Sequence, residues 1–201
     1  MSTVIDYYFT PISPWTYLGH ERFARIARAA GAPVRVLPVD LGGKVFPVSG
    51  GLPLAKRAPQ RQAYRLVELA RFSAHHDIVL NLHPKFFPVP VDDAARLIVA
   101  VALRDGDDAA MALTGAMGRA VWAEERNIAD AAELAAMVGA LGLPPERLAE
   151  AQSPEVQARY EANTERAIDA GVFGAPSYVI GGEVFWGQDR LDFVQRRLAR
   201  A

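Results

Sequence analysis

The sequence predicts an α/β fold in which strands from both ends of the chain share one sheet and an all-helical domain is inserted between them. The first forty residues read as strand, helix and strand, and strand character returns in the last forty. Between them, helical periodicity prevails. Since strands at both ends must meet in one sheet, we expect one domain from residues 1–41 plus 163–201 and an inserted helical domain over residues 42–162.

The first strand and the first helix meet at a serine–proline pair. Residues 4–9 are mostly β-branched and aromatic, which is typical of a buried strand. Ser13 is suited to cap the following helix, and Pro14 to occupy its first position. A second strand follows over residues 34–39, so we expect a right-handed βαβ unit with parallel strands.

The inserted segment should begin with a Gly/Pro-rich loop over residues 42–59 and continue as helices. The segment 92–104 is apolar almost all round and should be central to this part. Pro144-Pro145 mark a later turn. Helical spacing predicts five helices, over residues 60–76, 92–104, 107–124, 130–141 and 154–170.

The last strands form a predicted hairpin. Residues 177–180 and 183–186 have strand character, and Gly181-Gly182 between them is a two-residue turn signal. We expect the chain then to enter a final helix that runs to Arg200.

Composition excludes several classes of function. A net charge of −1 offers no basic field for nucleic acid or an anionic membrane. The absence of cysteine excludes disulfides, thiolate metal sites and dithiol redox chemistry by the protein itself. His75, His76 and His83 lack a carboxylate at a recognisable metal spacing, so no metal site is expected.

The ends and apolar runs of the sequence bear on localisation. The first residues, Met-Ser-Thr-Val-Ile-Asp, have neither a basic segment nor an apolar stretch of signal-peptide length. The longest apolar run, residues 97–103, is too short to span a bilayer. We therefore expect a cytoplasmic protein without a membrane partner.

Two proline motifs gain meaning when they are taken together. Alone, Ser13-Pro14 is what a plain helix cap looks like, and Ala175-Pro176 could be a turn before a strand. A thioredoxin-type βαβ unit, however, carries its C-x-x-C motif at this helix start, where residues 13–16 read Ser-Pro-Trp-Thr. Ala175-Pro176 matches the cis-proline loop that faces that motif in the same fold. The combination predicts a thioredoxin-like fold.

Three segments carry a closer resemblance, which covers nearly the whole chain. FTPISPWTYLG at residues 9–19, VWAEERNI at 121–128 and GVFGAPSYVIGGEVFWGQDRLDFV at 171–194 resemble 2-hydroxychromene-2-carboxylate isomerases. These enzymes belong with kappa-class glutathione transferases in the DsbA-like branch of thioredoxin folds. The resemblance implies glutathione as cofactor, a small aromatic substrate and a homodimer.

The resemblance also implies residue roles. Ser13 matches the catalytic serine that hydrogen-bonds the sulfur of glutathione and favours its thiolate, which a helix start also favours. Ala175, before a cis Pro176, would pair its main chain with the tripeptide. The γ-glutamyl end would be held by the next matching stretch, which comprises Trp186, Gly187, Gln188 and Asp189.

The chain departs from the family pattern in the inserted segment. Relatives often have an asparagine where this chain reads Ser-Gly-Gly-Leu-Pro at 49–53, and another where Pro90 stands. These changes leave the expected glutathione site intact and concern the substrate pocket. For that pocket we expect contributions from Trp15 and from two cations, Lys44 and Arg61.

The predicted function is isomerisation of 2-hydroxychromene-2-carboxylate, or of a similar aromatic ring-fission product, by reversible addition of the glutathione thiolate. Two alternatives remain open from the sequence. One is a kappa-like glutathione transferase that uses the same Ser13. The other is a noncatalytic glutathione- or peptide-binding module on a redox-inactive thioredoxin fold.

Overall fold

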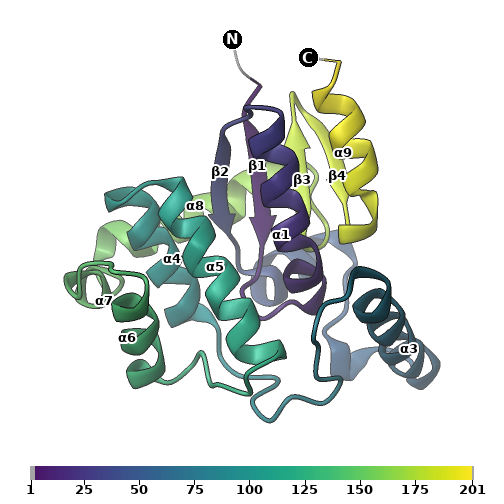
Figure 1. Cartoon of the computed structure of the whole chain (residues 1–201), viewed down its shortest axis with the longest axis horizontal. Helices are drawn as coiled ribbons and strands as arrows, with labels where there is room; N and C mark the ends of the chain where they lie inside the picture. Colours follow the sequence, from purple (N-terminus) through teal and green to yellow (C-terminus); the bar gives the residue numbers. More distant parts are fainter. Residues whose placement is uncertain (1–2, 201) are drawn as a thin grey trace.

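The computed structural model describes residues 3–200 and contains a four-stranded sheet in the order β2-β1-β3-β4. β1 and β2 are parallel, and β3 is antiparallel to both β1 and β4. The predicted sheet, built from both ends of the chain, is confirmed (Figure 1). The strands are β1 (Ile5–Phe9), β2 (Val34–Pro38), β3 (Ser177–Ile180) and β4 (Glu183–Trp186).

The other elements are helical, and the five helices predicted for the insert all form within two residues of their expected bounds. They are joined by short helices that periodicity did not indicate. In chain order the helices are α1 (Pro14–Ala29), η1 (Leu41–Val45), α2 (Phe46–Ser49), η2 (Leu54–Lys56), α3 (Pro59–His76), α4 (Asp92–Arg104), α5 (Asp107–Trp122), α6 (Ala131–Ala140), α7 (Glu146–Glu150), α8 (Pro154–Asp169), η3 (Gln188–Arg190) and α9 (Leu191–Leu198).

The predicted loop over residues 42–59 is wrong in part, because it contains η1, α2 and η2. The Asp40 carboxylate accepts a hydrogen bond from the Gly43 N–H at 2.7 Å and caps the first of these turns. Gly50 then ends α2 in the left-handed conformation, with a φ of 76°. Glycine and proline thus begin and end short helices here.

The hairpin prediction is confirmed. Gly181 and Gly182 join β3 to β4 with φ values of 59° and 85°. Two successive positive φ angles define the turn whose twist matches that of the flanking strands, and glycine adopts them without a Cβ clash.

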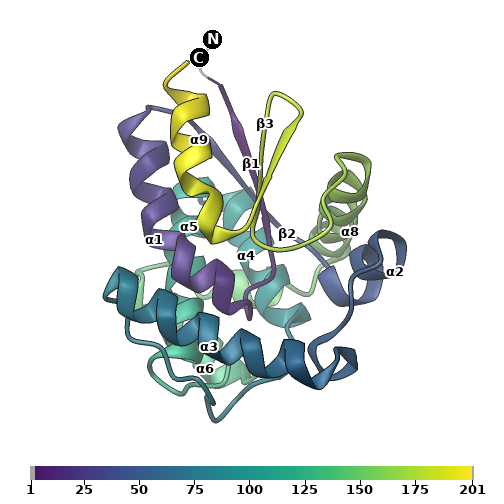
Figure 2. The ribbon, with the colours of Figure 1, turned by 90° about the vertical axis from the view of Figure 1, so that its right-hand side faces the viewer.

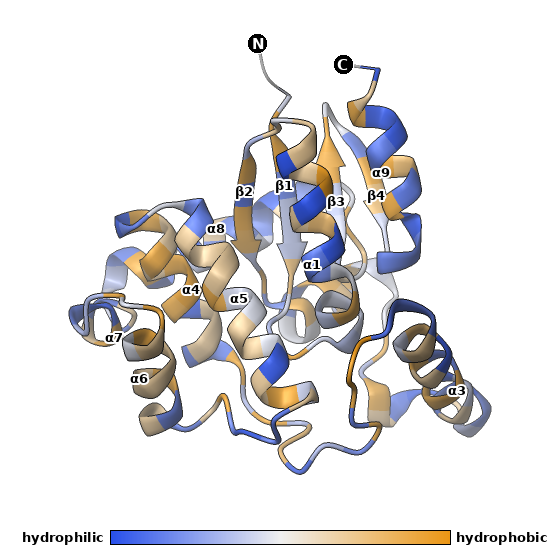
Figure 3. Ribbon diagram, in the orientation of Figure 1, coloured by the Kyte–Doolittle hydropathy of each residue, from blue (hydrophilic) through white to orange (hydrophobic). Residues whose placement is uncertain are grey.

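Helices cover both faces of the sheet. α1 and α9 lie on one face and α8 on the other (Figure 2). The alternation of β1 explains both layers, since Tyr7 and Phe9 join the core beneath α1 while Tyr8 packs with Ala167 of α8. Figure 3 shows hydrophobic residues along β2 and β3, a paler β1 between them, and hydrophilic residues over much of α3 and α9.

The inserted helices divide into two groups. α4 and α5 pack on each other and on β2, and α8 also contacts β2. α3 lies apart from them, beside the beginning of α1 (Figures 1 and 2). The two-domain division stays a prediction, and its second boundary, after residue 162, falls inside α8. Within residues 3–200, no helix is long and apolar enough to cross a membrane.

Candidate functional site

Ser13 begins α1 and has a hydrogen to donate. The residue is 8% exposed. Its Oγ accepts the Thr16 N–H at 3.2 Å, and its main-chain oxygen accepts the Tyr17 N–H at 3.0 Å. Within residues 3–200 its hydroxyl hydrogen has no acceptor. A hydroxyl at the positive end of a helix is suited to stabilise an anion.

The Ala175-Pro176 segment lies at the same edge of the sheet as Ser13. The peptide bond between the two residues is cis, as predicted. In the β1–β3 pairing Tyr8 stands opposite Ser177, so Pro176 follows beside Phe9, the last residue of β1, and Ala175 comes next, where the chain turns toward Ser13. The Pro176 carbonyl accepts the Gly187 N–H at 2.9 Å and ties this segment to the start of η3.

The turn after β4 contains the residues that the sequence predicts to bind the γ-glutamyl end of glutathione. Gly187 has a φ of 97°, a left-handed conformation that favours glycine. Gln188 is buried against Gly19 of α1, while Asp189 pairs with Arg190. The conformation of Gly187 thus turns the chain inward at Gln188, next to the first helix.

A groove of about 480 Å³ joins these segments to α3. Its volume falls in the range of small-molecule sites. The predicted residues Trp15, Arg61, Ala175, Trp186, Gly187, Gln188 and Asp189 line it. Sequence reasoning missed its α3 side and its far end, which consist of Arg57, Gln60, Tyr64, Arg65, Glu68, Phe72 and Arg190.

The remaining predicted residues lie outside this lining. Ser13 is two positions from the lining residue Trp15, and Pro176 is next to Ala175. Lys44 is exposed on η1 and does not line the groove. Its proposed substrate contact therefore has less support than that of Arg61.

Three arginines give the groove its charge. Arg61 and Arg65 lie one turn apart on the same face of α3, and Arg57 precedes them by four residues in the extended stretch before the helix. None of them pairs with a carboxylate of residues 3–200. The nearby Glu68 pairs with Arg71 at 2.9 Å. This row could have been found from its spacing, but nothing in the sequence places it opposite Ala175.

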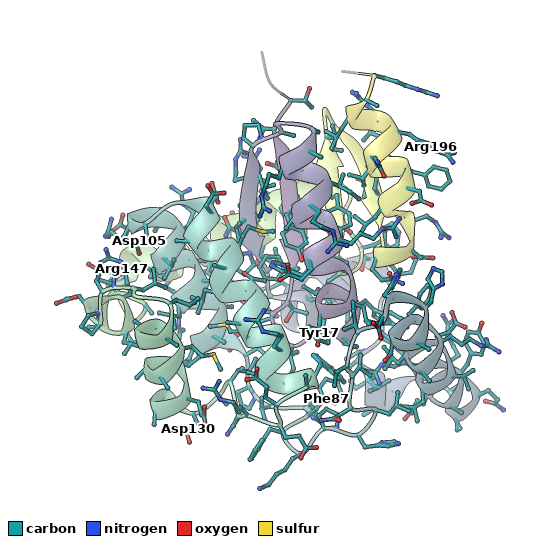
Figure 4. The ribbon with its side chains drawn as sticks, viewed as in Figure 1. Tyr17, Phe87, Asp105, Asp130, Arg147 and Arg196 are labelled. Carbon is teal, nitrogen blue, oxygen red and sulfur yellow. The ribbon has the colours of Figure 1, made fainter. Side chains whose placement is uncertain are left out.

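Arg65 is the most enclosed of the three. Its guanidinium lies 5.3 Å from the centroid of the Phe87 ring and 5.8 Å from that of Trp122. Phe87 lies where α5 and α3 approach the beginning of α1 (Figure 4). Burial lowers the pKa of Arg65 to about 10, so the side chain is still charged at neutral pH. An unpaired, partly desolvated cation is suited to bind a carboxylate.

The loop before Ser13 is supported by Trp122. This fully buried side chain donates from Nε1 to the Ile12 carbonyl at 3.2 Å. Trp122→Phe should lower the free energy of unfolding by about 1–3 kcal/mol, because it leaves a buried carbonyl unpaired and a void beside it. Denaturant titration measures this. Trp186→Phe, at a residue 50% exposed, should change stability by less than about 0.5 kcal/mol. Equal effects would contradict a supporting role for Trp122.

The described residues do not form a cluster of metal-ligating side chains at this site. Across the described part of the chain, no three His, Asp or Glu side chains gather as they would around a metal ion. The polar side chains of the groove are four arginines, the amides of Gln60 and Gln188, the Tyr64 hydroxyl and the carboxylates of Glu68 and Asp189, and the unpaired arginines among them suit an anionic organic molecule.

The sheet order and the helix that Ser13 caps define a thioredoxin-like protein. The chain belongs to the family of DSBA-like thioredoxin domains, whose model matches residues 4–199. The predicted DsbA-like fold is thus confirmed.

Within that family, the expected resemblance to 2-hydroxychromene-2-carboxylate isomerases is also confirmed. Such an isomerase from Sphingobium xenophagum is 29% identical over 98% of this chain and 99% of its own. The glutathione S-transferase kappa 1 of Caenorhabditis elegans is 26% identical over 94% and 88%. A solved structure of a 2-hydroxychromene-2-carboxylate isomerase superposes with a TM-score of 0.82 at 25% identity, and covers 98% of this chain and 95% of its own.

Proposed function

We propose that this chain is a glutathione-dependent isomerase that acts on 2-hydroxychromene-2-carboxylate or a similar aromatic ring-fission product. The groove carries this proposal, because it joins the surroundings of Ser13 to a row of unpaired arginines. The similarity to isomerases and kappa-class transferases supports the same reading. Without a cysteine in the sequence, a nucleophilic sulfur must come from a cofactor.

The groups along the groove fit glutathione. The Gln188 side-chain nitrogen is buried without a hydrogen-bond partner in residues 3–200. Because buried polar groups are normally hydrogen-bonded, an acceptor group on a bound ligand would satisfy this nitrogen. Asp189 would take the ammonium of the γ-glutamyl end, and the main chain of Ala175 would pair with the tripeptide. When bound, glutathione supplies a thiolate nucleophile for reversible addition to a carbon–carbon double bond.

Ser13 would act on the ionisation of the bound thiol. Its free hydroxyl hydrogen would be donated to the sulfur, and the start of α1 adds a favourable field. Because Ser13 is buried, water competes little for this hydrogen bond. The serine thus favours the charged form of the thiol at neutral pH.

The α3 side of the groove would hold the substrate. Arg61 and Arg65 would bind its carboxylate, as a guanidinium binds such groups through two parallel hydrogen bonds. Trp15 and Phe72, with ring centroids 6.1 Å apart, offer apolar walls for a conjugated ring system. The groove therefore fits an aromatic acid better than a neutral apolar compound.

A kappa-like transferase is the second candidate, and similarity to kappa-class enzymes favours it. The two functions differ in the fate of glutathione. An isomerase regenerates it in each cycle, whereas a transferase leaves it attached to the product. The expected site residues are the same for both.

One assay separates these functions. Purified protein is mixed with a large excess of 2-hydroxychromene-2-carboxylate over glutathione, and product and free thiol are followed together. An isomerase should convert many substrate molecules per glutathione with the thiol pool unchanged. Thiol loss equal to product formed would identify a transferase. Calorimetric binding of glutathione without turnover would indicate a binding module, and absence of binding would overturn the proposal.

A further inference from the structure

Within residues 3–200, the Gln188 side chain has a hydrogen-bond partner at one of its two polar atoms. The residue lines the groove and is 2% exposed. Its Oε1 accepts a hydrogen bond from Nε2 of His76 at 3.2 Å. Its Nε2 has no partner in the described part of the chain. A buried amide nitrogen without an acceptor costs free energy that an acceptor on a ligand would recover.

The backbone of Gln188 is fixed from two directions. The preceding Gly187 N–H is bound to the Pro176 carbonyl. On the other side Gly19 faces Gln188 so closely that a Cβ on Gly19 would lie 2.7 Å from the Gln188 Cβ. Rotation of the amide group is therefore the main freedom left to this side chain.

His76 determines that rotation. An amide oxygen can only accept, so His76 must carry a hydrogen on Nε2 and hold Oε1 toward α3. The amide hydrogens then point away from His76. The imidazole is itself held at the end of α3, where it stacks on Phe72, a groove residue, with centroids 5.9 Å apart. Burial lowers the pKa of His76, so the neutral ring has one N–H, which this contact uses.

We propose that His76 is a positioning residue that orients the Gln188 amide to donate to the α-carboxylate at the γ-glutamyl end of bound glutathione. The inference rests on the proposed glutathione site and adds a function for the end of α3. His76 acts through Gln188 and touches neither the thiol nor the substrate. It therefore affects how tightly glutathione binds and leaves the ionisation of the thiol unchanged.

Calorimetric titration with glutathione tests this in the full-length protein. His76→Ala should weaken binding about tenfold, the lower end of what a hydrogen bond to a charged group contributes. His75→Ala is the matched control, because this exposed neighbour has its ring 4.8 Å from that of His76, while the hydrogen bond to Gln188 comes from His76. It should bind within about twofold of wild type. His76→Gln, which places an amide donor at a similar reach, should recover most of the affinity.

A second ligand separates positioning from packing. In 4-aminobutyryl-cysteinylglycine the α-carboxylate of glutathione is missing, so wild type and His76→Ala should bind it equally. Equal weakening of both ligands by His76→Ala would assign His76 to packing and overturn the inference. Equal affinity of wild type and His76→Ala for glutathione would also overturn it. A wild type that binds no glutathione would overturn the proposed function, and this inference with it.

Discussion

Ser13→Ala should reduce turnover about 10- to 150-fold at neutral pH. The substitution deletes one hydrogen bond to a charged sulfur, which contributes about 1.5–3 kcal/mol. At about 1.4 kcal/mol per tenfold, this gives the stated loss. Since the lost hydrogen bond favours the thiolate, the pKa of the bound thiol should rise by about one to two. Thiolate absorbance of bound glutathione against pH measures this directly.

Ser153 provides a matched control. Like Ser13 it caps a helix whose next residue is proline, and its Oγ accepts the Val156 N–H at 3.3 Å. Ser13→Ala and Ser153→Ala should each cost about 1 kcal/mol of stability as lost caps. Only Ser13→Ala should raise the pKa of the thiol of bound glutathione. If the titration curves of both variants coincide with that of wild type, Ser13 is a helix cap and has no role in catalysis.

The part of the site near the sheet was predictable because its residues follow local motifs. Ser13-Pro14 marks a helix start, and Gly181-Gly182 fixes the hairpin that brings Gln188 back toward that start. Pairing of β1 with β3 then places Ala175 at the same edge. Each step depends on a turn or cap whose sequence signal is specific.

The α3 side could not be predicted in the same way. Its arginines show helical spacing, but the position of α3 depends on long connections and on contacts between residues far apart in sequence. Arg65 meets Phe87 and Trp122, and His76 meets Gln188 across 112 positions. Lys44 shows the converse, because its charge and its place in the inserted segment favoured a contact with an anionic substrate, while η1 leaves it exposed outside the groove lining.

Removing the charge of Arg65 should slow the reaction of a carboxylate substrate and spare that of its uncharged ester. Arg65→Leu keeps apolar contact with Phe87 and Trp122 but cannot bind a carboxylate. We expect kcat/KM for the carboxylate substrate to fall about 10- to 150-fold, the value of a hydrogen bond between charged groups. The methyl ester of the same substrate should react with wild type and variant at similar rates. Steady-state kinetics on the acid and its ester measure this difference.

Arg65 should matter more than its neighbours because its charge is already partly desolvated. Arg61 is exposed, and solvent screens its attraction for an anion. Arg71, on the same helix but paired with Glu68, offers a control whose conversion to leucine should leave both substrates unaffected. For Arg65→Lys, kcat/KM for the carboxylate substrate should lie between those of wild type and Arg65→Leu. The lysine keeps the charge and loses the contact of the guanidinium with two rings. Equal losses on acid and ester in Arg65→Leu would show that Arg65 supports the fold of the groove and does not recognise the carboxylate.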